Sequence, residues 1–184
     1  QNKEASLFPG AESGGTAIRK CTIHGKEILL QSSYSVLSVF TKDVAGKWRF
    51  SHNIKGFSNL IKRLEVDPAG NIWANHMYKG VYRIQLNATL DSVKELEYIT
   101  NPDSTRKESA LNVMMLRGRV VITDGYQFYM YEDLSQKVVP FNELNNQFKG
   151  MGDTYRIVPV NNDLYWFIRS SEYVLVGFEN GRYE

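Results

Sequence analysis

The sequence predicts an all-β fold, and three observations indicate it. First, four turn signals recur at intervals of 44 to 48 residues, marked by Gly25, Gly70, Gly118 and Asn162. Second, the apolar runs around each marker are short and rich in Val, Ile, Tyr and Phe, which is typical of strands rather than helices. Third, about 40 to 50 residues is the length of one β-propeller blade. We therefore expect a β-propeller of four-stranded antiparallel blades, a partial propeller of about four blades with the last incomplete.

Each repeat divides into four strands separated by turn residues. The expected strands are 18–23, 27–31, 35–41 and 47–52, then 61–66, 71–76, 80–86 and 94–99, then 112–116, 120–123, 127–132 and 137–141, and finally 155–160, 164–169 and 173–178. These strands place the blades at about 15–54, 55–103, 104–149 and 150–184. Residues 1–14 are rich in Gly, Ser and Glu, and we expect a linker or the end of a preceding element there.

The turn at 67–71, Asp-Pro-Ala-Gly-Asn, shows the chemistry of these connections most clearly. Its Asp can accept from backbone N–H groups ahead of it, Pro fixes φ, and Gly supplies the left-handed residue. Large aromatic side chains lie on strands that flank such turns, and we expect them to pack between adjacent sheets. They are Trp73, Tyr82, Tyr129 and Trp166.

Composition excludes several classes of function. The 22 Lys and Arg nearly balance the 20 Asp and Glu, so charge gives no case for direct nucleic-acid contact or for binding an anionic membrane surface. The single cysteine, Cys21, allows neither an intrachain disulfide nor a Cys-rich zinc site, and we expect it to be a small buried hydrophobe. No apolar run approaches the roughly 20 residues of a spanning helix. We expect a soluble chain or a soluble part of a larger protein, attached to a membrane only through other parts of that protein.

One stretch carries a family resemblance. The run 64–74, Leu-Glu-Val-Asp-Pro-Ala-Gly-Asn-Ile-Trp-Ala, followed by Lys-Gly-Val-Tyr-Arg-Ile at 79–84, resembles the two-component-regulator propeller repeat. The third repeat lacks the Trp, the fourth keeps Trp166 without the preceding Gly, and the first keeps only the strand pattern. Together the repeats extend the resemblance over about residues 15–184.

The resemblance implies a function that composition does not. In that family the repeats form the extracytoplasmic sensor of membrane-bound hybrid histidine kinases or helix-turn-helix regulators, common in gut Bacteroidetes. It implies a periplasmic location and a carbohydrate or other nutrient signal. In that family the propeller is usually followed by an immunoglobulin-like three-tyrosine domain and by a kinase or helix-turn-helix output domain. This sequence contains none of these domains, so we expect it to be a fragment of a longer regulator.

The loops between the second and third strands hold the candidate ligand-binding residues. A tyrosine recurs there in every repeat, and polar residues accompany it; the set is Tyr34, His76, Tyr78, Lys79, Asp124, Tyr126 and Tyr173. In a propeller these loops meet on one face, where tyrosine rings could stack on a saccharide and polar tips could bind its hydroxyls. Two alternatives stay open: each tyrosine begins the third strand and packs against the neighbouring blade, or the ring is a protein-docking face.

No catalytic constellation or cofactor motif stands out. The three histidines lack metal-ligand spacing, and acids on the inner strands are few, namely Glu65, Asp67 and Asp153. An axis lined by Arg and Asn does not favour a hard cation. The leading hypothesis is therefore a non-catalytic sensor with no metal, and the alternatives are an enzyme of the metal-dependent lactonase type or a protein-interaction scaffold. Because an open array exposes two sheet faces, we also expect a homodimer in which two sets of four blades make one ring.

Overall fold

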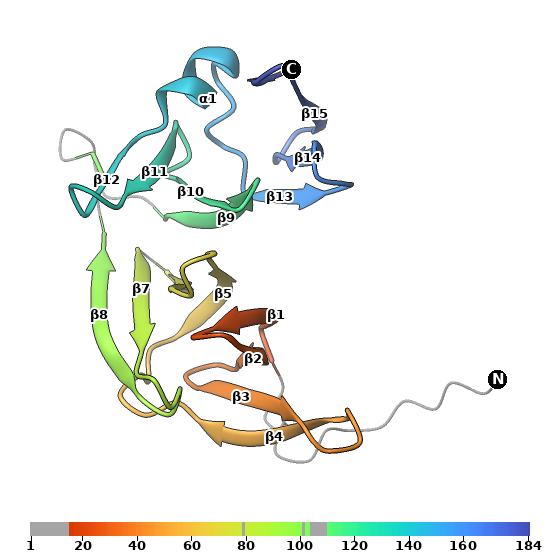
Figure 1. The fold of residues 1–184 in the computed structure, drawn as a ribbon. Coiled ribbons are helices and arrows are strands. Elements are labelled where there is room, and N and C mark those ends of the chain that lie inside the picture. Colours follow the sequence, from red (N-terminus) through yellow and green to blue (C-terminus); the bar gives the residue numbers. More distant parts are fainter. Residues whose placement is uncertain (1–14, 79, 101, 104–109) are drawn as a thin grey trace.

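The computed structural model describes residues 15–184 apart from 79, 101 and 104–109, and the expected linker at 1–14 lies outside the described residues. It confirms the predicted fold class. Four antiparallel sheets of four strands each are arranged as a four-blade β-propeller (Figure 1). Within each sheet the strands follow one another in sequence order, so every blade is a simple up-and-down meander.

The strands lie close to their predicted positions. The first sheet contains β1 (Ala17–Ile23), β2 (Lys26–Ser32), β3 (Leu37–Lys42) and β4 (Trp48–Asn53). The second contains β5 (Ile61–Val66), β6 (Ile72–His76), β7 (Val81–Leu86) and β8 (Val93–Ile99). The third contains β9 (Asn112–Leu116), β10 (Arg119–Thr123), β11 (Phe128–Glu132) and β12 (Lys137–Pro140). The fourth contains β13 (Arg156–Pro159), β14 (Leu164–Ile168), β15 (Tyr173–Glu179) and the two-residue β16 (Arg182–Tyr183).

The first strand of each sheet faces the centre of the molecule, and β4, β8 and β12 lie at the periphery (Figure 1). The inner strands contact one another in the order β1, β5, β9, β13. Among the described residues, no hydrogen bond or ion pair joins the first sheet to the fourth. The four sheets therefore form an arc that is held together at three interfaces.

A separate apolar cluster fills each of the three interfaces. Ile28, Leu30, Ile72 and Ile84 belong to the cluster between the first and second sheets. Trp73, Val113 and Tyr129 belong to the one between the second and third sheets. The cluster between the third and fourth sheets includes Met114, Phe128, Phe167 and Val176. Each sheet thus buries its apolar face against a neighbour, as stacked blades must do to be stable.

The turns confirm the predicted chemistry. His24 and Gly25 have φ of 49° and 73°, and Arg117 and Gly118 have φ of 50° and 74°. Two successive positive φ values match the right-handed twist of the flanking strands, which is why two-residue hairpins favour glycine. At the β5–β6 turn, Gly70 has φ of 87° and its N–H donates to the Asp67 carbonyl at 2.9 Å.

Two features differ from the sequence-based expectation. The predicted burial is confirmed for Trp73, Tyr82 and Tyr129. It is wrong for Trp166, which is 40% exposed because it lies on the face of the fourth sheet that no sheet covers.

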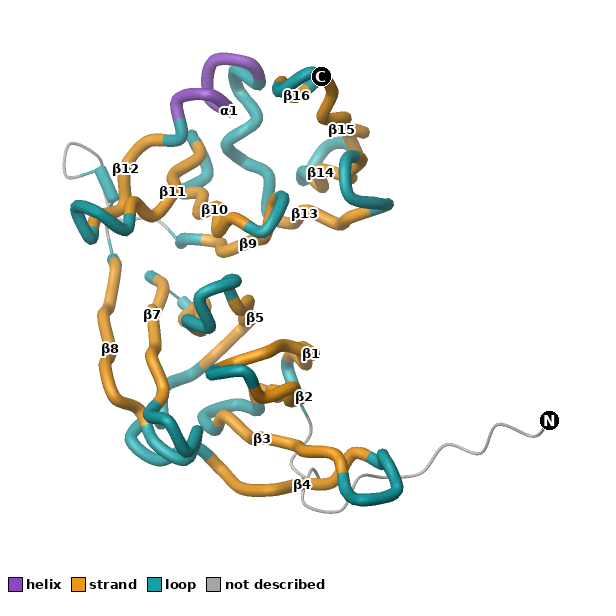
Figure 2. Tube along the Cα trace, in the orientation of Figure 1, coloured by secondary structure: helices purple, strands orange, loops and turns teal. Residues whose placement is uncertain are grey.

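The sequence also did not predict the short helix α1 (Asn142–Gln147), the only helix in the described part of the chain (Figure 2). The buried Leu144 anchors α1 to the cluster between the third and fourth sheets.

Candidate functional site

Three of the four recurring tyrosines, Tyr34, Tyr78 and Tyr126, lie on equivalent loops between the second and third strands of their sheets, and Tyr173 follows the corresponding loop as the first residue of β15. Because every sheet starts at its inner strand and meanders outward, these loops all leave on the same face of the propeller. Tyr34, Tyr78, Tyr126 and Tyr173 are 63%, 68%, 68% and 71% exposed. Their side chains therefore do not fill the interfaces between sheets, and they are available on what we call the tyrosine face.

Two of the predicted residues are brought together on the second sheet. The rings of His76 and Tyr78 have centroids 6.0 Å apart, and His76 also lies edge-on to Tyr82 and Tyr98 at 5.9 and 6.1 Å. Tyr82 and Tyr98 are cross-strand partners whose rings stack at 4.5 Å. Sequence reasoning missed Tyr98 as part of this aromatic cluster, although the pairing of β7 with β8 would have placed it beside Tyr82.

Asp124 has a different place from the one predicted. Its side chain is buried, and its Oδ1 accepts the backbone N–H groups of Tyr126 and Gln127 at 2.9 and 3.0 Å. Its Oδ2 accepts the hydroxyl of Tyr129 at 2.8 Å, and burial raises the pKa of that phenol to about 12. Asp124 therefore shapes the loop that presents Tyr126 and does not itself line the exposed surface.

The loops of neighbouring sheets are connected through the backbone. The Ile61 N–H donates to the Tyr34 carbonyl at 3.3 Å, and the Met77 N–H donates to the Leu60 carbonyl at 3.1 Å. These bonds link the loop that carries Tyr34 to the loop before Tyr78. Lys79, predicted beside them, lies outside the described residues.

The third loop is held against the connection that leads to the fourth sheet. A Cβ built on Gly152 would lie 1.9 Å from the Tyr126 carbonyl carbon, so only glycine fits here.

In the fourth sheet, Tyr173 begins β15, where it pairs with Ile168 of β14. Its neighbour Glu172 makes an ion pair with Arg169.

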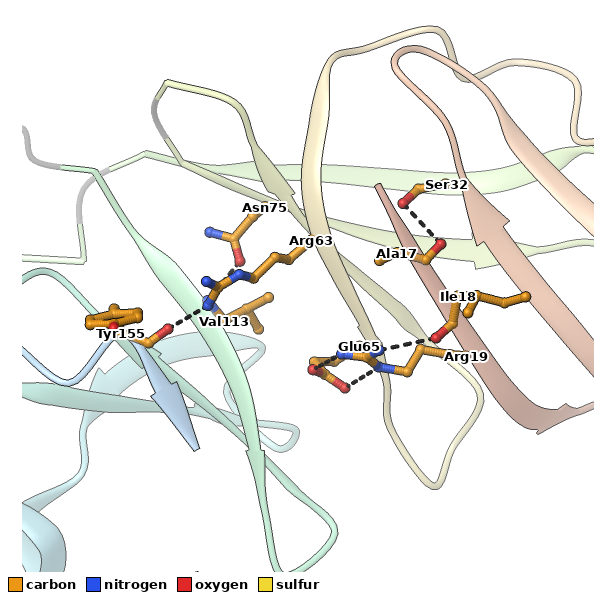
Figure 3. A network of polar contacts seen from close by, with 9 residues as sticks. All are labelled: Ala17, Ile18, Arg19, Ser32, Arg63, Glu65, Asn75, Val113 and Tyr155. Carbon is orange, nitrogen blue, oxygen red and sulfur yellow. Dashed lines mark hydrogen bonds and ion pairs between the residues drawn. The ribbon is translucent and has the colours of Figure 1, made fainter. Parts of the chain in front are cut away.

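A second concave feature, which we call the axial groove, lies where the inner strands meet. It is a cavity of about 830 Å³ lined by β1, β5, β9 and β13 and by the turns that follow β9 and β13. Each sheet contributes one arginine to its lining: Arg19, Arg63, Arg117 and Arg156. The carboxylates in the lining are Glu65 and Asp163. Glu65 accepts a two-pronged hydrogen bond from Arg19 at 2.7 and 3.0 Å (Figure 3).

The groove offers little to a hard cation. Arg19 occupies both oxygens of Glu65, and Arg117 lies 3.7 Å from Asp163. Across the described parts of the chain, no three His, Cys, Asp or Glu side chains gather in the way that a metal ion would need. Cys21 is half-buried against the cluster between the first two sheets, and burial raises the pKa of its thiol to about 11.

Comparison with known proteins adds no family assignment. Neither the family models nor the curated proteins that were searched match this chain. No helix in the described residues has the length and apolar character needed to cross a bilayer.

Proposed function

We propose that this chain is a non-catalytic propeller module that senses a ligand or relays a signal in a membrane-bound transcriptional or two-component regulator. The observation that carries the proposal is the tyrosine face: three tyrosines on equivalent loops and a fourth, Tyr173, where the corresponding loop enters β15, all mostly exposed. Exposed tyrosines that recur in every repeat and fill no core are typical of a recognition surface. The regulator context rests on the resemblance of residues 64–74 to that family's repeat, and it implies a periplasmic location.

The chemistry of this face suits a carbohydrate or a similar nutrient. Tyrosine rings can stack on the C–H surface of a sugar, while their hydroxyls bond to its hydroxyl groups. His76 packs edge-on against the stacked pair Tyr82 and Tyr98 and also contacts Tyr78, so the position of His76 in this part of the face is set before a ligand arrives. Holding a site in place lowers the entropy lost on binding.

Signal relay requires that a ligand favour one arrangement of the assembly over another. We extend the proposal to a homodimer, because the fourth sheet exposes an apolar face that includes Trp166 and Leu175 at 40% and 46%. A second copy could cover this face, and a ligand on the tyrosine face could then change how strongly the two copies associate. The parent regulator, not this module, would carry the membrane attachment and the output.

The test is calorimetry with a panel of neutral and acidic oligosaccharides. We expect at least one to bind, and we expect Tyr78→Ala and Tyr126→Ala each to weaken it by about three- to tenfold, since each removes a stacking surface. Leu134→Ala is the matched control, because Leu134 is fully exposed in the β11–β12 turn on the opposite face.

Two other outcomes would replace the proposal. If no saccharide binds and Tyr78→Ala instead abolishes self-association, the face is a protein-interaction scaffold. If carboxylates bind a metal ion near the axis and a lactone is hydrolysed, the chain is an enzyme of the lactonase type.

A further inference from the structure

The axial groove carries more positive than negative charge. Four guanidinium groups line it, against two carboxylates. Arg19 is fully engaged, because its Nε and Nη2 bind Glu65 and its Nη1 donates to the Ile18 carbonyl at 3.0 Å (Figure 3). Arg117 lies near Asp163 and over the ring of Phe178. The excess positive charge therefore rests on the remaining two arginines.

Arg63 and Arg156 come from the second and fourth sheets, and the charge of Glu65, whose oxygens bind Arg19, also acts on Arg63. Among the described residues, neither forms an ion pair with a carboxylate. Arg63 instead donates through Nη1 to the Tyr155 carbonyl at 2.6 Å, which holds its guanidinium beside the start of β13 (Figure 3). Burial, and next the charge of Arg156, lower the pKa of Arg63. Two like charges therefore face the same cavity, an arrangement that an anion between them would relieve.

We propose that the axial groove binds the oxyanion group of a small acidic molecule, a carboxylate or a sulfate, between Arg63 and Arg156. The planar guanidinium group can donate two parallel hydrogen bonds to such an oxyanion. These bonds are stronger when the guanidinium is partly buried than when it is fully solvated. The site is separate from the tyrosine face, so it stands whether or not that face binds a sugar.

The structure supplies the rigidity that such a site needs. Asn75 of β6 binds both the Leu111 carbonyl and the Val113 N–H, the latter at 2.7 Å, and so fixes the second sheet to the third. Thr123 of β10 donates to the Thr154 carbonyl at 3.1 Å and fixes the third sheet to the fourth. The sheets that carry Arg63 and Arg156 are thus both tied to the third sheet, the second through β9 and the fourth through β10.

The test is calorimetry of the 184-residue chain with sodium sulfate, sodium galacturonate and neutral galactose. We expect saturable binding of sulfate, galacturonate or both, weakened about ten- to a hundredfold by Arg63→Gln or Arg156→Gln. Arg182→Gln removes the same charge at the exposed position of β16, outside the groove, and should change the affinity less than twofold. Binding of galacturonate alone identifies a carboxylate ligand, and binding of sulfate alone identifies a sulfate ester.

Controls keep the proposal open to refutation. Arg156 is exposed at the edge of the groove, so Arg156→Gln should fold, as circular dichroism can check, even if Arg63→Gln does not. Arg156→Lys keeps the charge without the planar guanidinium group and should recover only part of the affinity. The proposal is overturned if neither anion saturates, if Arg182→Gln weakens binding as much as Arg156→Gln, or if only Tyr78→Ala reduces binding of galacturonate.

Discussion

Asp67 shows how one side chain determines a turn. Its Oδ1 accepts the Asn71 N–H at 2.9 Å, and its Oδ2 accepts both the Asn71 side-chain amide and the Trp73 indole N–H at 2.8 Å. The same carboxylate therefore closes the β5–β6 hairpin and satisfies a buried indole. These contacts give a physical reason for the Asp, Gly, Asn and Trp spacing in this repeat.

We predict that Asp67→Ala lowers the free energy of unfolding by about 2 to 4 kcal/mol, because it leaves the Trp73 indole N–H and the Asn71 N–H without their acceptor. Urea denaturation followed by tryptophan fluorescence measures the change. Asp133→Ala, at an exposed position in the β11–β12 turn, serves as the control and should be nearly neutral. Equal stabilities of the Asp67→Ala variant and the parent chain would contradict this account of the turn.

At the same scale, the sequence located the four loop tyrosines but not the orientation of Asp124. The tyrosines could be predicted because they recur at nearly constant spacing. The sequence Asp124-Gly125-Tyr126 is compatible with a carboxylate that accepts hydrogen bonds from its own loop and with one that faces a ligand. The structure distinguishes them, because the Asp124 carboxylate accepts hydrogen bonds from the backbone of its own loop and from the Tyr129 hydroxyl.

At the scale of strands and sheets, turn residues and short runs rich in Val, Ile, Tyr and Phe predicted most strand boundaries to within one or two residues. Helix α1 was missed because six residues are too few to display a helical period. The exposure of Trp166 was missed because a strand pattern does not reveal whether a neighbouring sheet exists. Its cross-strand partners Val158 and Leu175 share the same uncovered face.

The uncovered face of the fourth sheet leads to a prediction about self-association. If a second copy covers it, Trp166→Glu and Leu175→Glu should each raise the dissociation constant of the dimer at least about tenfold, because each buries a charge in an apolar contact. Sedimentation velocity over a concentration series measures this. Leu134→Glu adds the same charge at a fully exposed turn and should leave association unchanged. A parent chain that stays monomeric at high concentration would refute the dimer.

At the scale of the whole molecule, the arc of four sheets creates both surfaces considered above. It places equivalent loops on one face and gathers one arginine from each sheet around the axis. The repeat spacing predicted the first of these arrangements. The inner strands also predicted an axis lined by Arg and Asn, but the sequence did not show which of these arginines pairs with a carboxylate, because Arg19 and Glu65 meet only through the contact between β1 and β5.

The most direct test of the sensor proposal is fluorine NMR of the chain labelled with fluorotyrosine, titrated with a saccharide that binds in calorimetry. Each of the 11 tyrosine signals can be assigned by replacing one Tyr with Phe. We predict that signals of Tyr34, Tyr78, Tyr126 and Tyr173 shift with saturation, while the signal of buried Tyr129 stays in place. Saturating binding that leaves all four loop signals unmoved would contradict the claim that this face senses the ligand.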